Sequence, residues 1–345
     1  MEAARLHGYH EKLRLETVDE PGVGGPFDVI VRIGGAGLCR TDLHIVEGQW
    51  VEKSGVRLPY TLGHENAGWV HEVGSAVTNV AVGDPVIVHP LVTCGLCRAC
   101  RAGDDMHCAS SAFPGINVDG GFATFLRTSA RSLVKLEPNL QPKDVAALAD
   151  AGLTAYHAVK KAAALLRPGT KAVVIGAGGG LGHIGIQSLK ALTPAEVVAV
   201  DVSEQALELA RELGAEHAVL VDGSQIQQVL ELTDGEGAEV VIDFVGEKGA
   251  LEDGVAMLRR AGTYYVIGYG EALNVPTIDI IAAEITFAGN LVGTYNDLAE
   301  LMTLASQGKV RLHTEEYPLG AVNEAMADLD GGRLHGRAIL IPEGS

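Results

Sequence analysis

Apolar segments divide the chain into two parts that differ in their spacing of apolar and polar residues. Up to about residue 149, short apolar runs flanked by Gly and Pro predict β-strands, among them residues 28–33, 68–73 and 84–90. From about Asp150, short and fully apolar strands alternate with helical stretches. The first pattern predicts a β-rich domain, and the second predicts a parallel, doubly wound sheet.

The second part opens with the apolar run 171–175, a cluster of glycines and a helical pattern that extends through Ala191. A second strand ends at Asp201, and Ser203 is placed to cap a helix that ends before Gly214. Three further apolar runs, HAVLVD, EVVIDFVG and GTYYVIG, continue the alternation. Near the C-terminus, RAILIPE predicts one more strand, which returns to the first domain.

A chain of 345 residues exceeds one ordinary hydrophobic core, so two domains are expected. We place residues 1–151 and 292–345 in the β-rich domain and residues 152–291 in the doubly wound domain, which makes the fold class α/β. The 44 glycines agree with many tight turns between strands and helices.

Charge and hydropathy exclude several classes of function. A net charge of -18 argues against a nucleic-acid surface, which needs clustered Lys and Arg. No apolar run reaches the roughly 18 residues of a membrane span, and no signal peptide is visible at the N-terminus. We therefore expect a cytoplasmic protein with no membrane partner, in which clustered cysteines are reduced and bind metals.

Four of the five cysteines fall in one short segment, CGLCRACRAGDDMHC, as Cys94, Cys97, Cys100 and Cys108. Four thiolates on one loop can surround a Zn²⁺ ion tetrahedrally, and a site with four protein ligands is structural. Arg98 and Arg101 lie inside the loop and would offset the negative charge. Two disulfides or an iron–sulfur cluster are the alternatives. The expected compartment disfavours disulfides, and the spacing differs from that of a bacterial ferredoxin.

The fifth cysteine, Cys39, stands in the string GLCRTDLH, and His64 follows in TLGHENAGWV. These two strings and the four-cysteine segment, in this order, resemble the zinc-dependent alcohol dehydrogenases of the medium-chain dehydrogenase/reductase superfamily. The resemblance covers essentially the whole chain. It implies a GroES-like catalytic domain for the β-rich part and a Rossmann coenzyme domain for the doubly wound part.

The resemblance implies a second, catalytic zinc ion bound by Cys39, by His64 and by a third residue just before the coenzyme domain. The matching position is Asp150, since no cysteine is left. Two anionic ligands and a neutral imidazole balance the charge of Zn²⁺. A helix N-cap is the alternative role of Asp150. Glu65 is either a fourth zinc ligand or a carboxylate that orients its neighbours.

The family pattern also implies a proton path and a set of substrate contacts. Thr41 lies two residues after Cys39 and His44 lies five residues after it, so the resemblance makes them carriers of the alcohol proton. By alignment with the family, the residues that would line the substrate pocket are Trp50, His89, Pro90, Leu91 and Leu291.

The string KAVVIGAGGGLGHIGIQ predicts a dinucleotide site. Gly176 and Gly178 fit the first positions of G-x-G-x-x-G, but Leu181 takes the third. The glycines instead follow as Gly176, Gly179 and Gly182, with Gly178 and Gly180 between them. A buried strand precedes this turn, a helix follows it, and the next strand ends in Asp201. A carboxylate there binds the ribose hydroxyls of NAD and repels the 2′-phosphate of NADP.

By the same resemblance, Arg40 and Arg337 are candidates for the coenzyme pyrophosphate. The residues expected to flank the adenosine or the nicotinamide are Thr154, Phe244, Val245, Gly268, Leu291 and Val292.

The sequence therefore predicts an enzyme with two zinc ions per subunit that transfers a hydride between a primary or secondary alcohol and NAD. The alcohol is expected to be apolar, and the product an aldehyde or a ketone. A polyol dehydrogenase of the same superfamily is the nearest alternative. A non-catalytic NAD-binding redox sensor is a second one. A homo-oligomer is expected, with a tetramer favoured over a dimer.

Overall fold

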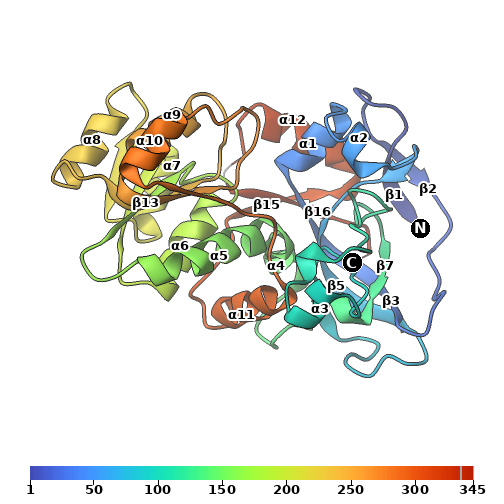
Figure 1. Cartoon of the computed structure of the whole chain (residues 1–345). Coiled ribbons are helices and arrows are strands. Elements are labelled where there is room, and N and C mark those ends of the chain that lie inside the picture. Colours follow the sequence, from blue (N-terminus) through green and yellow to red (C-terminus); the bar gives the residue numbers. More distant parts are fainter. Residues whose placement is uncertain (335, 345) are drawn as a thin grey trace. The chain divides into compact units, whose positions relative to one another are not determined.

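The computed structural model describes residues 1–334 and 336–344 (Figure 1). The chain forms two compact units, Met1–Leu153 with Thr294–Ser345, and Thr154–Gly293. The boundaries expected from the sequence lie two residues away, at 151/152 and 291/292. Helix α5 (Ala151–Ala162) runs through the boundary at 153/154. The change in sequence pattern on which the prediction relied therefore comes slightly before the division between the units.

The first unit is built on a seven-stranded sheet in which β15, β16, β3, β5, β6 and β8 follow one another and β7 also pairs with β3. Its strands are β3 (Asp28–Leu38), β5 (Glu65–Val73), β6 (Pro85–Val88), β7 (Phe125–Ser129), β8 (Leu133–Lys135), β15 (Thr314–Pro318) and β16 (Arg337–Ile341). A second sheet has the order β2-β1-β4, with β1 (Glu2–Leu6), β2 (Arg14–Thr17) and β4 (Tyr60–Thr61).

Strand β16 confirms that the C-terminal apolar segment returns to the first unit. It pairs antiparallel with β3, with Ile339 opposite Gly37 and Leu340 opposite Ala36. Strand β3 is buried along almost its whole length, and its apolar run does not alternate with polar residues, as expected for a strand that is covered on both faces.

Short helices complete the first unit. They are α1 (Arg40–Val46), α2 (Val51–Ser54), α3 (Arg98–Ala102), α4 (Pro142–Val145), α11 (Tyr295–Ser306) and α12 (Val322–Asp330), with the 3₁₀ segments η1 (Asp105–His107), η2 (Ala130–Ser132), η3 (Ala146–Ala149) and η5 (Leu319–Ala321). Helix α11 begins at a capping box in which Thr294 and Asp297 satisfy each other's backbone N–H groups.

The second unit is a six-stranded parallel sheet in the order β11-β10-β9-β12-β13-β14. This is the strand order of the doubly wound dinucleotide-binding fold, as predicted. Its strands are β9 (Lys171–Ile175), β10 (Glu196–Asp201), β11 (His217–Leu220), β12 (Ala238–Asp243), β13 (Leu258–Val266) and β14 (Thr286–Gly289). Its helices are α5, α6 (Gly182–Leu192), α7 (Glu204–Glu212), α8 (Gln225–Leu232), α9 (Ala250–Ala256) and α10 (Thr277–Ala283), with η4 (Ala163–Leu165) after α5.

Helices cover both faces of this sheet, because its strands carry apolar side chains on both sides. Residues of α5, α6 and α7 share one apolar cluster with Ala172, Val174 and Val240. Residues of α8 and α9 share the other with Val173, Val198 and Val241. Among the described residues, no helix is long and apolar enough to cross a membrane.

Candidate active site and metal centres

The segment from Cys94 to Cys108, here called the four-cysteine loop, gathers its four sulfur atoms into one place. They lie within 4.8 Å of one another, and all four cysteines are free. The sulfur atoms of a tetrahedral zinc site are about 3.8 Å apart, given Zn–S bonds of about 2.3 Å. The Sγ atoms of Cys97 and Cys100 are 3.5 Å apart, much further than in a disulfide. The loop therefore fits a structural zinc ion, and the disulfide alternative is wrong.

Backbone N–H groups prepare two of these thiols, those of Cys94 and Cys97, to bind a cation, whereas burial raises the pKa of Cys100 to about 11. The N–H of Cys94 donates to Cys108 Sγ at 3.3 Å, and the N–H of Cys97 donates to Cys94 Sγ at 3.4 Å. Backbone N–H groups around Cys97 lower the pKa of its thiol, as do those around Cys94 for that residue. A lowered pKa favours the thiolate, which is the form that binds zinc.

One further cation lies beside this loop. Arg131 lies on η2, and a Cβ at Gly95 would lie 2.6 Å from its Cζ atom, so the guanidinium packs against the loop backbone. Arg131 also lines a cavity of about 290 Å³ together with Cys100. Arg98 and Arg101, the expected cations, are exposed on α3. No sequence signal joins Arg131 to the loop, because it lies 23 residues beyond Cys108.

The second group of ligand candidates is buried deep in the first unit, and we call Cys39, His64 and Asp150 the catalytic cluster. Cys39 precedes α1 and acts as its N-cap residue. Asp42, fully buried in the first turn of α1, accepts a hydrogen bond from the Cys39 backbone N–H at 2.9 Å through Oδ2. Its Oδ1 lies 3.4 Å from His64 Nδ1. One carboxylate thus positions two of the candidate ligands.

The imidazole of His64 faces the rest of the cluster with its other nitrogen. Nε2 lies 3.4 Å from Asp150 Oδ2, and like Nδ1 it is buried and makes no hydrogen bond within the described part of the chain. Cys39 Sγ, a His64 nitrogen and a Glu65 carboxylate oxygen lie within 4.8 Å of one another. A buried nitrogen without a hydrogen bond, beside a thiol and a carboxylate, fits a divalent cation.

Burial opposes a charge on His64, but Asp42 and Cys39 raise the pKa of the imidazole well above its usual value. The anionic surroundings therefore attract a positive charge, either a proton or a metal ion. A metal ion and a proton cannot both bind at Nε2 of His64, so metal binding would release the proton from this nitrogen.

Glu65 and Arg337 form a buried ion pair behind the cluster. A guanidinium nitrogen of Arg337 donates to Glu65 Oε2, and Oε1 accepts from the Ala151 backbone N–H at 3.1 Å. Burial raises the pKa of Glu65, and Arg337 opposes that shift. Because both oxygens have protein donors, the geometry favours the orienting role of Glu65 over the ligand role. Arg337 is 4% exposed, which places this pyrophosphate candidate inside the first unit.

The expected proton carriers lie on the same helix as Asp42. Thr41 and His44 are half-buried on α1, one helical turn apart, while Arg40 is exposed. Among the residues expected to line the substrate pocket, His89, Pro90 and Leu91 are buried after β6, and Trp50 is half-buried before α2. Phe113, which sequence analysis did not single out, meets the His64 ring edge-on at a centroid distance of 6.0 Å.

In the second unit, the glycine turn joins β9 to α6, and its tight positions differ from those expected. A Cβ at Gly178 would lie 2.5 Å from Ala206 Cβ, and one at Gly182 would lie 2.0 Å from the Gly176 carbonyl oxygen. A Cβ at Gly179 would meet only the Gly176 oxygen, at 3.2 Å. A side chain is therefore excluded by close packing at Gly178, whereas the spacing of the glycines in the sequence assigned this role to Gly179. Gly180 and Leu181 complete the turn.

Asp201 ends β10 beside this turn. Its Oδ2 accepts from the Gly178 N–H at 3.0 Å, and its Oδ1 accepts from the Val202 N–H at 2.8 Å. The carboxylate is thus held at the carboxyl edge of the sheet, where dinucleotides bind in this fold. Ser203 caps α7 by accepting from the Ala206 N–H, as predicted.

The remaining coenzyme candidates of this unit gather around two other turns. Phe244 and Val245 follow β12, and Gly268 follows β13. Thr154 lies on α5, and its carbonyl accepts from Asn290 at 3.1 Å. Leu291 is 54% exposed, whereas the next residue, Val292, is buried with φ 45°.

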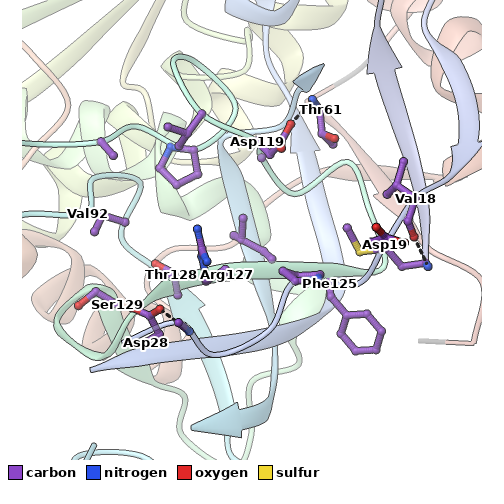
Figure 2. Close-up of a pocket in the computed structure, with 18 of the residues that line it drawn as sticks. Val18, Asp19, Asp28, Thr61, Val92, Asp119, Phe125, Arg127, Thr128 and Ser129 are labelled. Atoms are coloured by element: carbon purple, nitrogen blue, oxygen red, sulfur yellow. Dashed lines mark hydrogen bonds between the residues drawn. The ribbon is translucent and has the colours of Figure 1, made fainter. Parts of the chain in front are cut away.

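A cavity of about 860 Å³ lies elsewhere in the first unit (Figure 2). Loop residues such as Asp19 and Asp119 line it together with Phe125 and Arg127 of β7. None of the site residues expected from the sequence is among its lining residues. This cavity therefore contributes no group to the chemistry of the catalytic cluster.

Comparison with known proteins points to the same family as these sites. The model of the alcohol dehydrogenase GroES-like domain matches residues 25–138, and that of the zinc-binding dehydrogenase matches residues 180–307. The NAD-dependent alcohol dehydrogenase of Sulfurisphaera tokodaii is 37% identical over 99% of this chain and all of its own.

Two further proteins are similar to this chain over almost its whole length. The crystal structure of the alcohol dehydrogenase from the archaeon Aeropyrum pernix is 51% identical, with a TM-score of 0.96 over 99% of this chain and 100% of its own. The D-arabinose 1-dehydrogenase (NADP(+)) of Saccharolobus solfataricus is 36% identical over 99% of this chain and 97% of its own. The chain therefore belongs to the zinc-dependent alcohol dehydrogenases of the medium-chain dehydrogenase/reductase superfamily.

Proposed function

We propose that the catalytic cluster of Cys39, His64 and Asp150 is the active centre of this NAD-dependent alcohol dehydrogenase, which interconverts alcohols with aldehydes or ketones. The observation that carries the proposal is the buried Nε2 of His64, which makes no hydrogen bond among the described residues and faces the Asp150 carboxylate at 3.4 Å. A thiolate, a carboxylate and a neutral imidazole form a ligand set suited to Zn²⁺.

When bound, zinc supplies Lewis-acid stabilisation of negative charge on the alcohol oxygen, and NAD accepts the hydride. The chain's own residues hold the ligands and move the proton. Asp42 orients His64 through Nδ1 and restrains the Cys39 backbone. Glu65 places a negative charge behind the cluster. Both of its carboxylate oxygens accept hydrogen bonds, one from Arg337 and one from the Ala151 N–H, so neither is assigned to the metal.

We assign the alcohol proton to Thr41 and His44. The Thr41 hydroxyl accepts it from the substrate and passes it on towards His44, whose imidazole releases it to solvent. Both side chains lie on α1, directly after Cys39, so the helix that positions a ligand also positions the proton carriers.

For the coenzyme, we place the pyrophosphate at the glycine turn, from Gly176 to Gly182, and at the N-terminus of α6. The Asp201 carboxylate accounts for NAD over NADP, because it would repel a 2′-phosphate. The pyrophosphate role of Arg40 and Arg337 stays a proposal. So do the contacts of Thr154, Phe244, Val245, Gly268, Leu291 and Val292.

The substrate is proposed to be a mainly apolar alcohol, in keeping with Trp50, Pro90 and Leu91 and with the neighbouring Phe113. A sugar or polyol is the second candidate, favoured by the D-arabinose 1-dehydrogenase among the relatives. NADH formation across primary, secondary, aromatic and polyol substrates, with NAD and with NADP, separates the two. Turnover that a zinc chelator abolishes supports the active centre, while no turnover with any substrate supports a non-catalytic sensor.

We further propose a cytoplasmic homotetramer. Ile278 and Ile281 on α10 are 65% and 70% exposed, and association would cover such apolar surface. Light scattering of the purified protein measures the number of subunits directly, and a monomeric mass would contradict this assignment.

A further inference from the structure

Asp243 is the last residue of β12, a strand with β9 on one side and β13 on the other. Its carboxylate is fully buried and has several hydrogen-bond donors. Oδ1 accepts from the backbone N–H groups of Val245 at 2.8 Å and Gly246 at 3.1 Å, and Oδ2 accepts from the Tyr264 hydroxyl at 2.7 Å. The side chain of Asp243 therefore shapes the turn that follows β12.

The backbone of the same residue holds a second turn. The Asp243 carbonyl accepts from the N–H groups of Ile267 at 3.1 Å and Gly268 at 2.9 Å, which lie directly after β13. Asp243 thus joins the turn 244–246 to the turn 267–268. These two turns carry three of the coenzyme candidates, Phe244, Val245 and Gly268.

The two turns also touch each other, with no room for a side chain between them. A Cβ at Gly246, where φ is +66°, would lie 2.2 Å from the Gly268 carbonyl carbon. A Cβ at Gly268 would lie 2.3 Å from the Val245 carbonyl carbon. Because the contact is between backbones, a shift of one turn must displace the other.

The turn after β12 packs in addition against the glycine turn and the helix that follows it. A Cβ at Gly176 would lie 2.7 Å from a methyl group of Val245, and one at Gly185 would lie 2.8 Å from the Phe244 ring. The position of residues 244–246 is thereby coupled to the turn that binds the pyrophosphate in this fold.

A buried carboxylate is stable only where donors replace water. Burial raises the pKa of Asp243, while Tyr264 and the two backbone N–H groups oppose the shift. Tyr264 is itself fully buried, and burial together with Asp243 raises the pKa of its hydroxyl, which therefore stays protonated and donates. A Cβ at Gly254 of α9 would lie 2.6 Å from the Tyr264 ring, so that ring fills its space completely.

We propose that Asp243 and Tyr264 are a buried positioning pair that holds the turns 244–246 and 267–268 in the shape that binds NAD. The pair sets the affinity for the coenzyme from beneath those turns. This inference rests on the coenzyme contacts proposed above for Phe244, Val245 and Gly268. It assigns no contact with the alcohol or with either metal centre.

The test uses Asp243→Asn and Tyr264→Phe in the full-length, zinc-loaded enzyme. Asp243→Asn keeps the shape but removes the negative charge and replaces one accepting oxygen by a donating NH2 group, and Tyr264→Phe removes one donor. We expect the Kd for NADH, measured by fluorescence titration, and the KM for NAD to rise about tenfold or more in each variant. The KM for the alcohol and the zinc content should stay unchanged. Since both changes act on one pair, their effects should not add. The double variant should have about the same Kd for NADH as the single variant that binds NADH less tightly.

Gln225→Leu is the matched control, since Gln225 is a buried polar residue of the same unit that donates to Asp253 at 2.6 Å. It should lower the Tm without changing the Kd for NADH. If Tyr264→Phe and Asp243→Asn lower the Tm but bind NADH like the wild type, the positioning role is refuted and the proposed function stands. If the wild type itself does not bind NADH, the proposed coenzyme site fails, and the positioning role fails with it.

Discussion

The four-cysteine loop and the catalytic cluster both gather candidate metal ligands, but the chain builds them in opposite ways. The loop takes all its ligands from 15 consecutive residues, and Cys94 is exposed. The catalytic cluster takes Cys39 from the start of α1, His64 from just before β5, and Asp150 from between η3 and α5. Its ligands are 8%, 1% and, for the Asp150 side chain, 15% exposed.

The difference indicates what holds each site together. Apart from the metal, little secondary structure supports the loop, which contains only α3 and η1. Metal binding there contributes to folding itself. The catalytic cluster is held by the sheet, by Asp42 and by the Glu65–Arg337 pair, so we expect its geometry to survive loss of the metal. Equivalent substitutions at the two sites should therefore have opposite effects on activity and stability.

The largest effect is expected from Cys39→Ser and His64→Ala. Each removes a proposed ligand from the proposed active centre, so kcat/KM for alcohol oxidation should fall at least about a thousandfold. The Tm should remain close to that of the wild type, because the protein scaffold holds the cluster. Steady-state NADH formation and calorimetry measure both quantities. Wild-type turnover in either variant would show that the cluster is not the active centre.

Asp42→Asn tests the support of the cluster rather than its ligands. The amide cannot supply the negative charge beside His64 Nδ1, so zinc affinity or activity should fall about 10- to 100-fold. Competition with a graded chelator measures the affinity. Asp144→Asn, at an acidic position of α4 in the same unit, is the control and should leave zinc binding unchanged.

Cys97→Ser is the counterpart of Cys39→Ser in the four-cysteine loop. It should remove the structural zinc and lower the Tm by roughly 5 °C or more, as expected for a loss of a few kcal/mol. Turnover at low temperature should persist. The comparison between the two sites breaks down if Cys97→Ser abolishes turnover at a temperature where the variant is fully folded.

Arg131→Gln should have the smallest effect of this series. Removing the guanidinium that packs on Gly95 takes away positive charge beside four thiolates, so a chelator should extract the loop zinc a few times faster. Arg98→Gln, at an exposed arginine inside the loop, should change the rate less. If the chelator extracts zinc from both variants at equal rates, then only the net charge near the loop matters, and the specific contact of Arg131 with the loop has no role.

Much of this organisation could be predicted from the sequence, because it depends on local patterns. Buried strands such as residues 171–175, the cap at Ser203 and the spacing of the four cysteines each need only a few neighbouring residues. The family resemblance added Asp150 as the third ligand candidate, which the structure places 3.4 Å from His64.

The contacts that escaped prediction join distant parts of the chain. Arg337 and Glu65 are 272 residues apart, and Tyr264 and Asp243 are 21 residues apart. No periodicity marks such partners, since each is set by which strands become neighbours in a sheet. The packing of Gly178 could not be predicted for a related reason: a Cβ there would meet Ala206 on α7, outside the glycine motif.

The zinc content of Asp150→Ala tests the central claim most directly, because the chain has no spare cysteine for the position of the proposed third ligand. We expect the zinc content to fall from two ions per chain to one, with the four-cysteine loop still occupied and alcohol oxidation lost. Asp150→Cys, which restores a two-cysteine, one-histidine set, should keep both ions. If Asp150→Ala retains two zinc ions and wild-type turnover, then Asp150 is not a ligand and the proposed active centre is wrong.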